Sequence, residues 1–110
     1  RGSCLTGRHP HRFKCFNHGY KLGKREVTIA QVAKQAGYAT GHFGKWHLNG
    51  IRGPGKPIST EDAFGPGKFG FDTWLSVTNY FELDTTFSRN GEKVKIPGDL
   101  SLPWERRSRF

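Results

Sequence analysis

The chain of 110 residues contains no methionine, two cysteines and half as many acidic as basic residues. Its apolar runs all fall short of the roughly 18 residues of a membrane-spanning helix, and no apolar core of a signal peptide is present. Without a methionine, residue 1 is not a retained initiator, so we expect a processed product or, preferably, a fragment of a longer protein. Cys4 and Cys15 could form one disulfide or stay reduced, so they do not indicate a compartment.

What the chain does have is positive charge and many loop-forming residues. Lys and Arg number 18 against 9 Asp and Glu, which gives a net charge of +9, while 34% of residues are hydrophobic and 15 are glycine. This length suits one domain with a modest core. The surplus charge favours anionic partners such as nucleic acid, acidic lipid, or phosphorylated or sulfated molecules.

The clearest helix signal is "VTIAQVAKQAG" at residues 27–37. Thr28 is suited to the N-cap, and Gly37 to the C-terminal stop. The apolar positions Ile29, Val32, Ala33 and Ala36 follow the i, i+3, i+4, i+7 spacing of one helix face. The sequence therefore predicts an amphipathic helix here.

After this helix we expect a short strand over residues 38–43, which completes half of a βαβ unit. Active sites of α/β proteins lie beyond such strand ends, so "GKWHLNG" at 44–50 is predicted to be a ligand-facing loop. Residues 51–68 are rich in Gly and Pro and read as a long functional or weakly ordered loop. "FDTWLSVTNYF" has strand-forming residues, and Asn90-Gly91 predicts a β-hairpin.

Lys45 and His47 are the first candidate site residues. Two positions apart on an extended loop, their side chains can point the same way. Lysine offers three donors and a compact charge, and histidine exchanges protons near neutral pH, so the pair suits sulfate or phosphate. The alternative is a solvated lysine beside a histidine stacked on Trp46.

Two further clusters have weaker signals. The first could bind zinc, although it lacks a C-x2-C pair and chance proximity is the simpler interpretation; it comprises Cys4, His9, His11, Cys15 and His18. The second interleaves aromatic and basic residues, as nucleic-acid-binding surfaces do; it comprises Arg12, Phe13, Lys14 and Phe16. Most of the nine Phe are expected in the core.

The order of motifs is more informative than any one of them. "RGSCLTGRHPHR", "TIAQVAKQAGYATGHFGKWHLNG" and "GFDTWLSVTNYFELD…SRNGE" together strongly resemble the sulfatase family of the alkaline-phosphatase-like α/β fold, over residues 1–99. In that family a C-x-P-S-R or C-x-A-x-R motif precedes "LTGR", and its cysteine becomes the formylglycine nucleophile. Arg1 matches the last residue of this motif, so the resemblance places the nucleophile just upstream of Arg1. Cys4 lacks the motif's context and is not the modified cysteine.

The resemblance also implies a role for each matching residue. Lys45 would bind the substrate sulfate and the formylglycine oxygen, and His47 would hydrogen-bond the formylglycine hydroxyl and assist its proton transfers. Arg1 would brace the formylglycine. These cations would stabilise charge on the transferring sulfuryl group. The calcium ligands of the family fall in parts that this chain lacks.

The sequence thus predicts an α/β fragment of a sulfatase: a helix–strand unit, a long loop and a hairpin in a partial domain over 1–99, with a tail over 100–110 that does not resemble the family. The implied parent hydrolyses sulfate esters of a sulfated small molecule or polysaccharide, outside the cytoplasm or in the lysosome, and the chain alone is expected to be inactive. The alternative is a small basic module that binds nucleic acid or another polyanion. A phosphatase-like relative is less favoured because "GKWH" after "LTGR" is typical of sulfatases.

Overall fold

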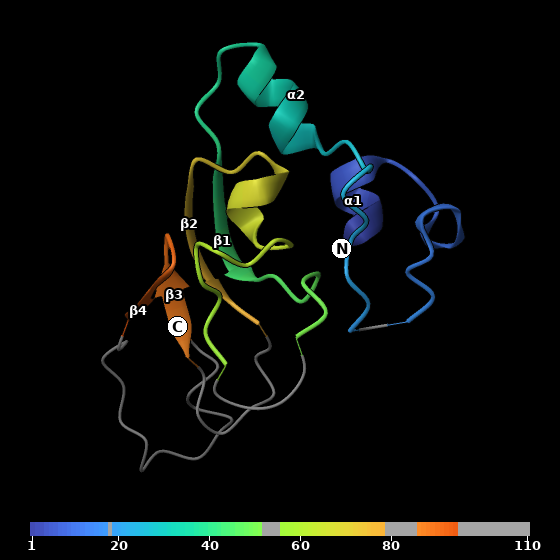
Figure 1. The fold of residues 1–110 in the computed structure, drawn as a ribbon. Helices are drawn as coiled ribbons and strands as arrows, with labels where there is room; N and C mark the ends of the chain where they lie inside the picture. Colours follow the sequence, from blue (N-terminus) through green and yellow to red (C-terminus); the bar gives the residue numbers. More distant parts are fainter. Residues whose placement is uncertain (18, 52–55, 79–85, 95–110) are drawn as a thin grey trace, which may run out of the picture.

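A mixed four-stranded sheet organises the protein (Figure 1). The computed structural model describes residues 1–17, 19–51, 56–78 and 86–94. The strands are β1 (Gly41–Lys45), β2 (Thr73–Val77), β3 (Phe87–Arg89) and β4 (Glu92–Val94), in the order β1-β2-β3-β4. β1 runs parallel to β2, whereas β2–β3 and β3–β4 are antiparallel. The α/β class and the parallel unit after the helix are confirmed.

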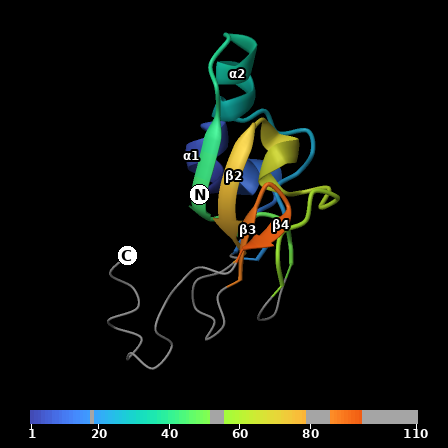
Figure 2. The same ribbon diagram turned by 90° about the vertical axis from the view of Figure 1, so that its left-hand side faces the viewer.

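Four short helical elements accompany the sheet: α1 (Gly2–Thr6), η1 (Pro10–Phe13), α2 (Ile29–Gln35) and η2 (Pro66–Phe69). Figures 1 and 2 show η2 beside β2 and α2 beyond the start of β1, while α1 contacts α2. The core between them and the sheet contains Phe13, Leu22, Trp46, Leu48, Ile58, Phe69 and Trp74. Part of the predicted loop over 51–68 therefore contributes to the core, while residues 52–55 lie outside the described residues.

The predicted helix cap and hairpin are both present. The Thr28 hydroxyl accepts from the Gln31 backbone N–H while the Gln31 side chain accepts from the Thr28 N–H, which is a reciprocal capping box. At the hairpin, Asn90 and Gly91 both have positive φ, 49° and 97°, as a two-residue turn between antiparallel strands requires. These two predictions are confirmed.

The apolar face of α2 is more exposed than the amphipathic pattern implied. Ile29 is 65% exposed and Val32 54% exposed, whereas the residue that α2 buries is Ala30. A methyl group on Gly70 would come within 2.6 Å of the Gln31 backbone nitrogen, so the end of η2 touches the opposite face of the helix. This contact turns the apolar face away from the described part of the fold.

The first strand also lies further along the chain than predicted, at residues 41–45 rather than 38–43. Thr40 lies just before the strand, where its hydroxyl donates to the Gly70 carbonyl at 2.5 Å and its backbone N–H donates to Asp72. Pairing with β2 begins only at Gly41 opposite Thr73. Strand propensity alone could not locate this boundary because partners 30 residues away set it.

Candidate functional site

The candidate site forms where β1 ends. Lys45 is the last residue of the strand, and the Trp46 N–H continues the ladder by donating to the Val77 carbonyl at 2.8 Å. The Trp46 side chain is fully buried, and its Nε1 donates to the Phe64 carbonyl at 2.7 Å. Trp46 therefore anchors the backbone between the two predicted site residues, Lys45 and His47.

The chain turns sharply at His47, which has a φ of 47°. Few non-glycine residues adopt this left-handed conformation, so the flanking contacts must hold it. Leu48 supplies one such contact, because it is buried and its carbonyl accepts from the Leu22 N–H at 2.7 Å. Asn49 supplies another by donating to Asp62 Oδ2 at 2.8 Å.

This turn corrects one part of the sequence argument. We expected Lys45 and His47 to point the same way because both would lie on an extended segment. Lys45 does lie in a strand, but His47 is not extended, so the alternation of side chains does not apply between them. The His42 ring meets the Trp46 indole edge-on, at 5.0 Å and 85°.

Arg1 comes to the same place from the other end of the sequence. Its Nη1 donates to the Trp46 carbonyl at 3.2 Å, across 45 positions of the chain. The next residue, Gly2, packs closely on the core: a methyl group there would lie 3.0 Å from the Phe13 ring. The structure thus brings Arg1 beside the backbone that joins Lys45 to His47.

The electrostatics of this strand end are cationic. Burial, and then the charge of Arg1, lower the pKa of Lys45. Arg1 is therefore near enough to act electrostatically on Lys45. A negative group placed here would be attracted to both cations.

His42 is a residue that sequence reasoning missed. Its Nδ1 shares a hydrogen bond of 2.6 Å with Ser76 Oγ, and its ring also packs on Phe71. Burial, with a smaller effect from Arg1, lowers the pKa of His42 to about 4, so the ring is neutral at pH 7. The available signal was its place in "GHFGK", where alternation from the exposed Phe43 directs His42 toward the opposite face of the strand.

The residues described by the structure do not assemble the possible zinc site. They contain no group of three or more His, Cys, Asp or Glu residues that could hold a metal ion. Cys4 and Cys15 are both free thiols, and Cys15 Sγ donates to the Lys21 carbonyl at 3.3 Å. Burial, and after it the charge of Glu26, raise the pKa of Cys15. His18, the fifth member of the cluster, lies outside the described residues.

None of the helices in the described ranges is both long and apolar enough to cross a membrane.

The aromatic–basic stretch at 12–16 divides between two environments. Phe13 is buried in the core, whereas Phe16 is 58% exposed.

The fold and this strand end define an α/β unit with two cations gathered beside a tight turn. Comparison with known proteins identifies the family: the Sulfatase family profile matches residues 1–99. The chain belongs to the Sulfatase family. It is 39% identical over 97 residues to an arylsulfatase of Hemicentrotus pulcherrimus, covering 78% of this chain and 17% of that protein.

Two other relatives agree with this assignment. An ulvan-active sulfatase of Formosa agariphila is 36% identical over 105 residues, covering 92% of this chain and 19% of that protein. A protein solved with its substrate D-glucosamine-2-N,6-O-disulfate superposes with a TM-score of 0.57 at 26% identity, over 84% of this chain and 17% of that one. The chain spans less than a fifth of the length of these relatives.

Proposed function

We propose that this chain forms part of the sulfate-binding pocket of a sulfuric ester hydrolase, and that Arg1, Lys45 and His47 contact the sulfate and the nucleophile. The observation that supports this most is the hydrogen bond from Arg1 to the Trp46 carbonyl, which brings a second cation to the Lys45 strand end. At about 4 Å, a Lys–sulfate pair is worth roughly 4 kcal/mol at an effective dielectric near 20.

Each residue has a distinct part in the proposal. Lys45 binds a sulfate oxygen, and the partial burial that lowers its pKa also leaves the ammonium less solvated, which strengthens its attraction to an anion. Arg1 braces the nucleophile from the adjacent side. His47, held in its turn by Leu48 and Asn49, hydrogen-bonds the nucleophile's hydroxyl and moves its proton.

The nucleophile and the metal lie outside this chain in the proposal. Formylglycine, upstream of the position of Arg1, supplies the hydroxyl that attacks sulfur in the parent enzyme. The described residues do not fit a calcium site, because calcium takes six to eight oxygen ligands and no acidic cluster is present among them. We therefore assign the calcium ligands to the rest of the parent protein.

The substrate class is a sulfated sugar or sulfated polysaccharide. Support comes from the relatives, one of which is ulvan-active and another of which has a disulfated glucosamine as its substrate. From its membership of the Sulfatase family we also propose that the parent enzyme lies outside the cytoplasm or in the lysosome. We also retain residues 1–99 as the partial sulfatase domain; the tail at 100–110 lies outside the described residues.

The test measures the affinity of the full chain for D-glucosamine-2-N,6-O-disulfate by NMR titration. Lys45→Ala is expected to weaken binding about tenfold or more, because a partly buried cation is lost. Lys93→Ala is the matched control, since Lys93 is an exposed lysine on β4 and should leave affinity unchanged. Equal affinities of the wild-type chain and Lys45→Ala would overturn the proposal.

A basic module for nucleic acid or another polyanion remains the second candidate. The observation that favours it is the net charge of +9. It predicts a steep loss of oligonucleotide binding with salt and little effect of Lys45→Ala. The two candidates therefore differ in the response to one substitution.

A further inference from the structure

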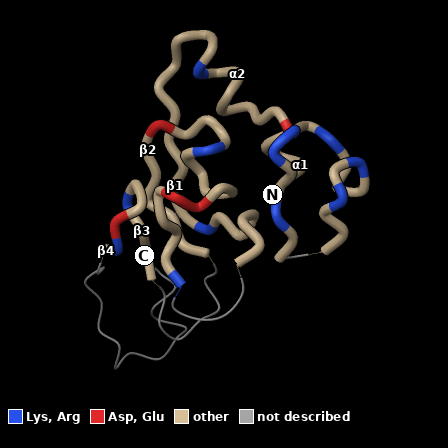
Figure 3. Tube along the Cα trace, viewed as in Figure 1, with Lys and Arg blue, Asp and Glu red and all other residues tan. Residues whose placement is uncertain are grey.

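In the N-terminal quarter of the chain, all the fully charged side chains are basic. Residues 1–25 contain no Asp or Glu. Their cations are Arg1, Arg8, Arg12, Lys14, Lys21, Lys24 and Arg25. Figure 3 shows basic residues gathered around α1 and the loop that follows it, with an acidic residue beside them. The first acidic residue in the sequence is Glu26, which pairs with Arg8 at 2.6 Å.

Most of this charge is left without a local counter-charge. Within the part of the chain that the structure describes, no carboxylate lies at ion-pair distance from Arg12, Lys14, Lys21 or Lys24. Like charges held close together repel, and an anionic ligand removes that repulsion as it binds. The segment is therefore suited to a ligand that carries several negative charges along its length.

Aromatic rings follow the same segment. His9 and His11 are 5.1 Å apart between ring centroids, His11 and Phe16 are 5.3 Å apart, and Phe16 and Tyr20 are 6.2 Å apart. Phe16 is 58% exposed and Tyr20 42% exposed. These rings are not needed to fill the core, so their exposed faces are free to pack against an amphipathic ligand.

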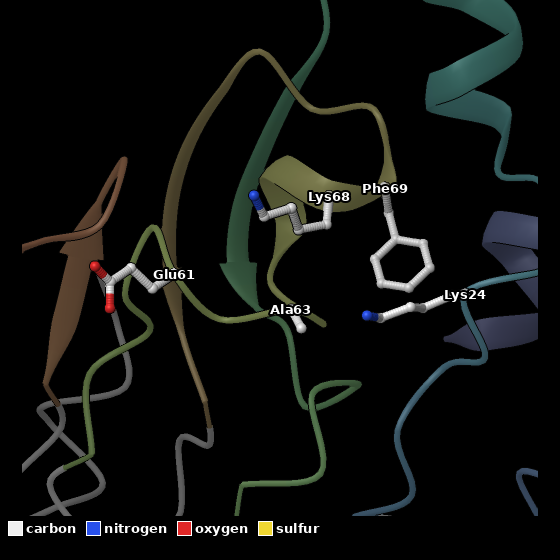
Figure 4. A pocket seen from close by; sticks show the side chains of 5 residues that line it. All are labelled: Lys24, Glu61, Ala63, Lys68 and Phe69. Carbon is white, nitrogen blue, oxygen red and sulfur yellow. The ribbon is translucent and has the colours of Figure 1, made fainter.

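Two of the lysines converge at the other end of the segment. The Lys21 ammonium lies 4.7 Å and the Lys24 ammonium 5.4 Å from the centroid of the same Phe64 ring. Lys24 also lines a pocket of about 420 Å³ that Lys68 and Glu61 border (Figure 4). The ring holds both ammonium groups in place without neutralising either, which prepares them for an external anion.

We infer that the exposed side chains of residues 9–16 and 20–24, which we call the aromatic–basic surface, bind a linear sulfated polysaccharide. Adjacent rings in the row are inclined by 64° to 83°, so they do not offer the parallel platforms on which successive nucleic-acid bases stack. Sugar rings each present their own C–H face and can follow such changes of direction. The choice of a sulfated polymer over another polyanion rests on the proposed function.

The surface is made of residues other than Arg1, Lys45 and His47, although its 20–24 end adjoins the proposed pocket, where the Leu22 N–H donates to the Leu48 carbonyl. Its contribution should therefore grow with ligand length, whereas the contact of Lys45 with one sulfate group should not. A monosaccharide sulfate and an oligosaccharide thus report on different parts of the chain. This separates failure of the surface from failure of the sulfate pocket.

The experiment measures the affinity of the full chain for a heparin-derived octasaccharide at several salt concentrations. Arg12→Gln with Lys14→Gln is expected to lower affinity about fivefold and to flatten the salt dependence. Phe16→Ala with Tyr20→Ala is expected to lower affinity about fivefold at every salt concentration. Lys56→Gln with Lys93→Gln removes the same charge from exposed positions elsewhere and should change affinity less than about twofold.

All the substituted side chains are exposed, and circular dichroism melting checks that each variant is folded. Equal losses in the control and in the Arg12/Lys14 variant would overturn the proposal, because only net charge would then matter. The proposal would also be overturned if single-stranded DNA of matched charge bound as tightly as the octasaccharide and lost the same affinity in the Phe16→Ala, Tyr20→Ala variant. Binding of glucosamine disulfate should be unchanged in the surface variants and weakened by Lys45→Ala. If Lys45→Ala does not weaken it while the octasaccharide results are as expected, the proposed function is contradicted and the proposal for the surface stands.

Discussion

Arg1 and Trp46 are joined by a hydrogen bond of 3.2 Å from a guanidinium to a backbone carbonyl. The carbonyl belongs to the peptide that links Trp46 to His47. Arg1 therefore contacts the backbone of the "GKWH" stretch, which resembles the sulfatase motif. Trp46 in turn is fixed by the buried hydrogen bond to Phe64. The position of the cation thus depends on an indole that does not itself face a ligand.

Replacing Trp46 by Phe should test this dependence. The substitution removes the donor to the Phe64 carbonyl and leaves a small void in a fully buried position. We expect a loss of about 2 kcal/mol in the free energy of unfolding, measured by urea titration. An unchanged unfolding midpoint would contradict the anchoring role of the indole.

The depressed pKa of His42 predicts a pH-dependent stability. His42 stays neutral in the folded chain down to about pH 4, whereas an unfolded histidine takes up a proton near pH 6.5. As the pH falls from 6.5 toward 4, the unfolded state gains a proton that the folded state does not, so stability falls. The linkage amounts to about 3 kcal/mol at most.

The control for this pH effect is His42→Gln, measured over the same range by urea unfolding. Both proteins share every carboxylate and the other histidines, so the difference between their pH profiles isolates His42. We expect the profile of the wild-type chain to be the steeper one between pH 4 and 6.5. Parallel profiles would show that the buried, hydrogen-bonded state of His42 is wrong.

Thr28 joins the start of α2 to the core. Its hydroxyl accepts from the Gln31 N–H and donates to the Phe69 carbonyl at 2.5 Å. Thr28→Ala should therefore cost about 2 kcal/mol of unfolding free energy, the upper range for a helix cap. Thr28→Ser keeps both hydrogen bonds and should retain most of the stability; equal losses in the two variants would point to the methyl group instead.

Gly70 should tolerate no side chain. It has a φ of 95°, and a methyl group there would meet the Gln31 backbone at 2.6 Å. Gly37 also has a positive φ, 86°, but open space around it. Gly37→Ala should cost about 1 kcal/mol from backbone conformation alone, and Gly70→Ala clearly more, as measured by thermal unfolding. Equal costs would mean that the close approach of η2 and α2 is absent.

The 110-residue chain should not hydrolyse an aryl sulfate. The proposal assigns the nucleophile and the metal to parts outside the chain, and these provide the main catalytic terms. The assay compares the purified chain with Lys45→Ala and with buffer. Turnover that Lys45→Ala abolishes would show that this chain has its own nucleophile.

The features that sequence reasoning located well are local ones. Thr28 and Gly37 lie at the two ends of one helix, and Asn90-Gly91 lies within one turn, so the interactions that decide them are between neighbours in the chain. The start of β1 was misplaced because Thr40 is positioned by Gly70, 30 residues later in the sequence. The face of α2 that meets the fold could not be predicted because Gly70 also sets it, by its close approach to Gln31. Such distant partners cannot be recognised from the hydrophobic pattern around the residues that they position.

The candidate site follows the same rule. The motif around Lys45 and His47 could be read directly, but the left-handed turn at His47 and the contact from Arg1 arise from tertiary structure. His42 was missed because its importance depends on Ser76 in the neighbouring strand. Residue identity suggested the chemistry, while packing determined which side chains meet.

β1 lies at an edge of the sheet, and among the described residues its only strand partner is β2. The middle residue of the strand is Phe43, which is 72% exposed, and its one charged side chain, Lys45, lies at the end, so no charge protects the middle of this edge. An unprotected edge is a template for strands of other molecules. The net charge of +9 opposes that encounter in dilute buffer, but salt shortens its range to about 10 Å at 0.1 M. The purified chain should therefore stay monomeric at low ionic strength and begin to self-associate as salt is added.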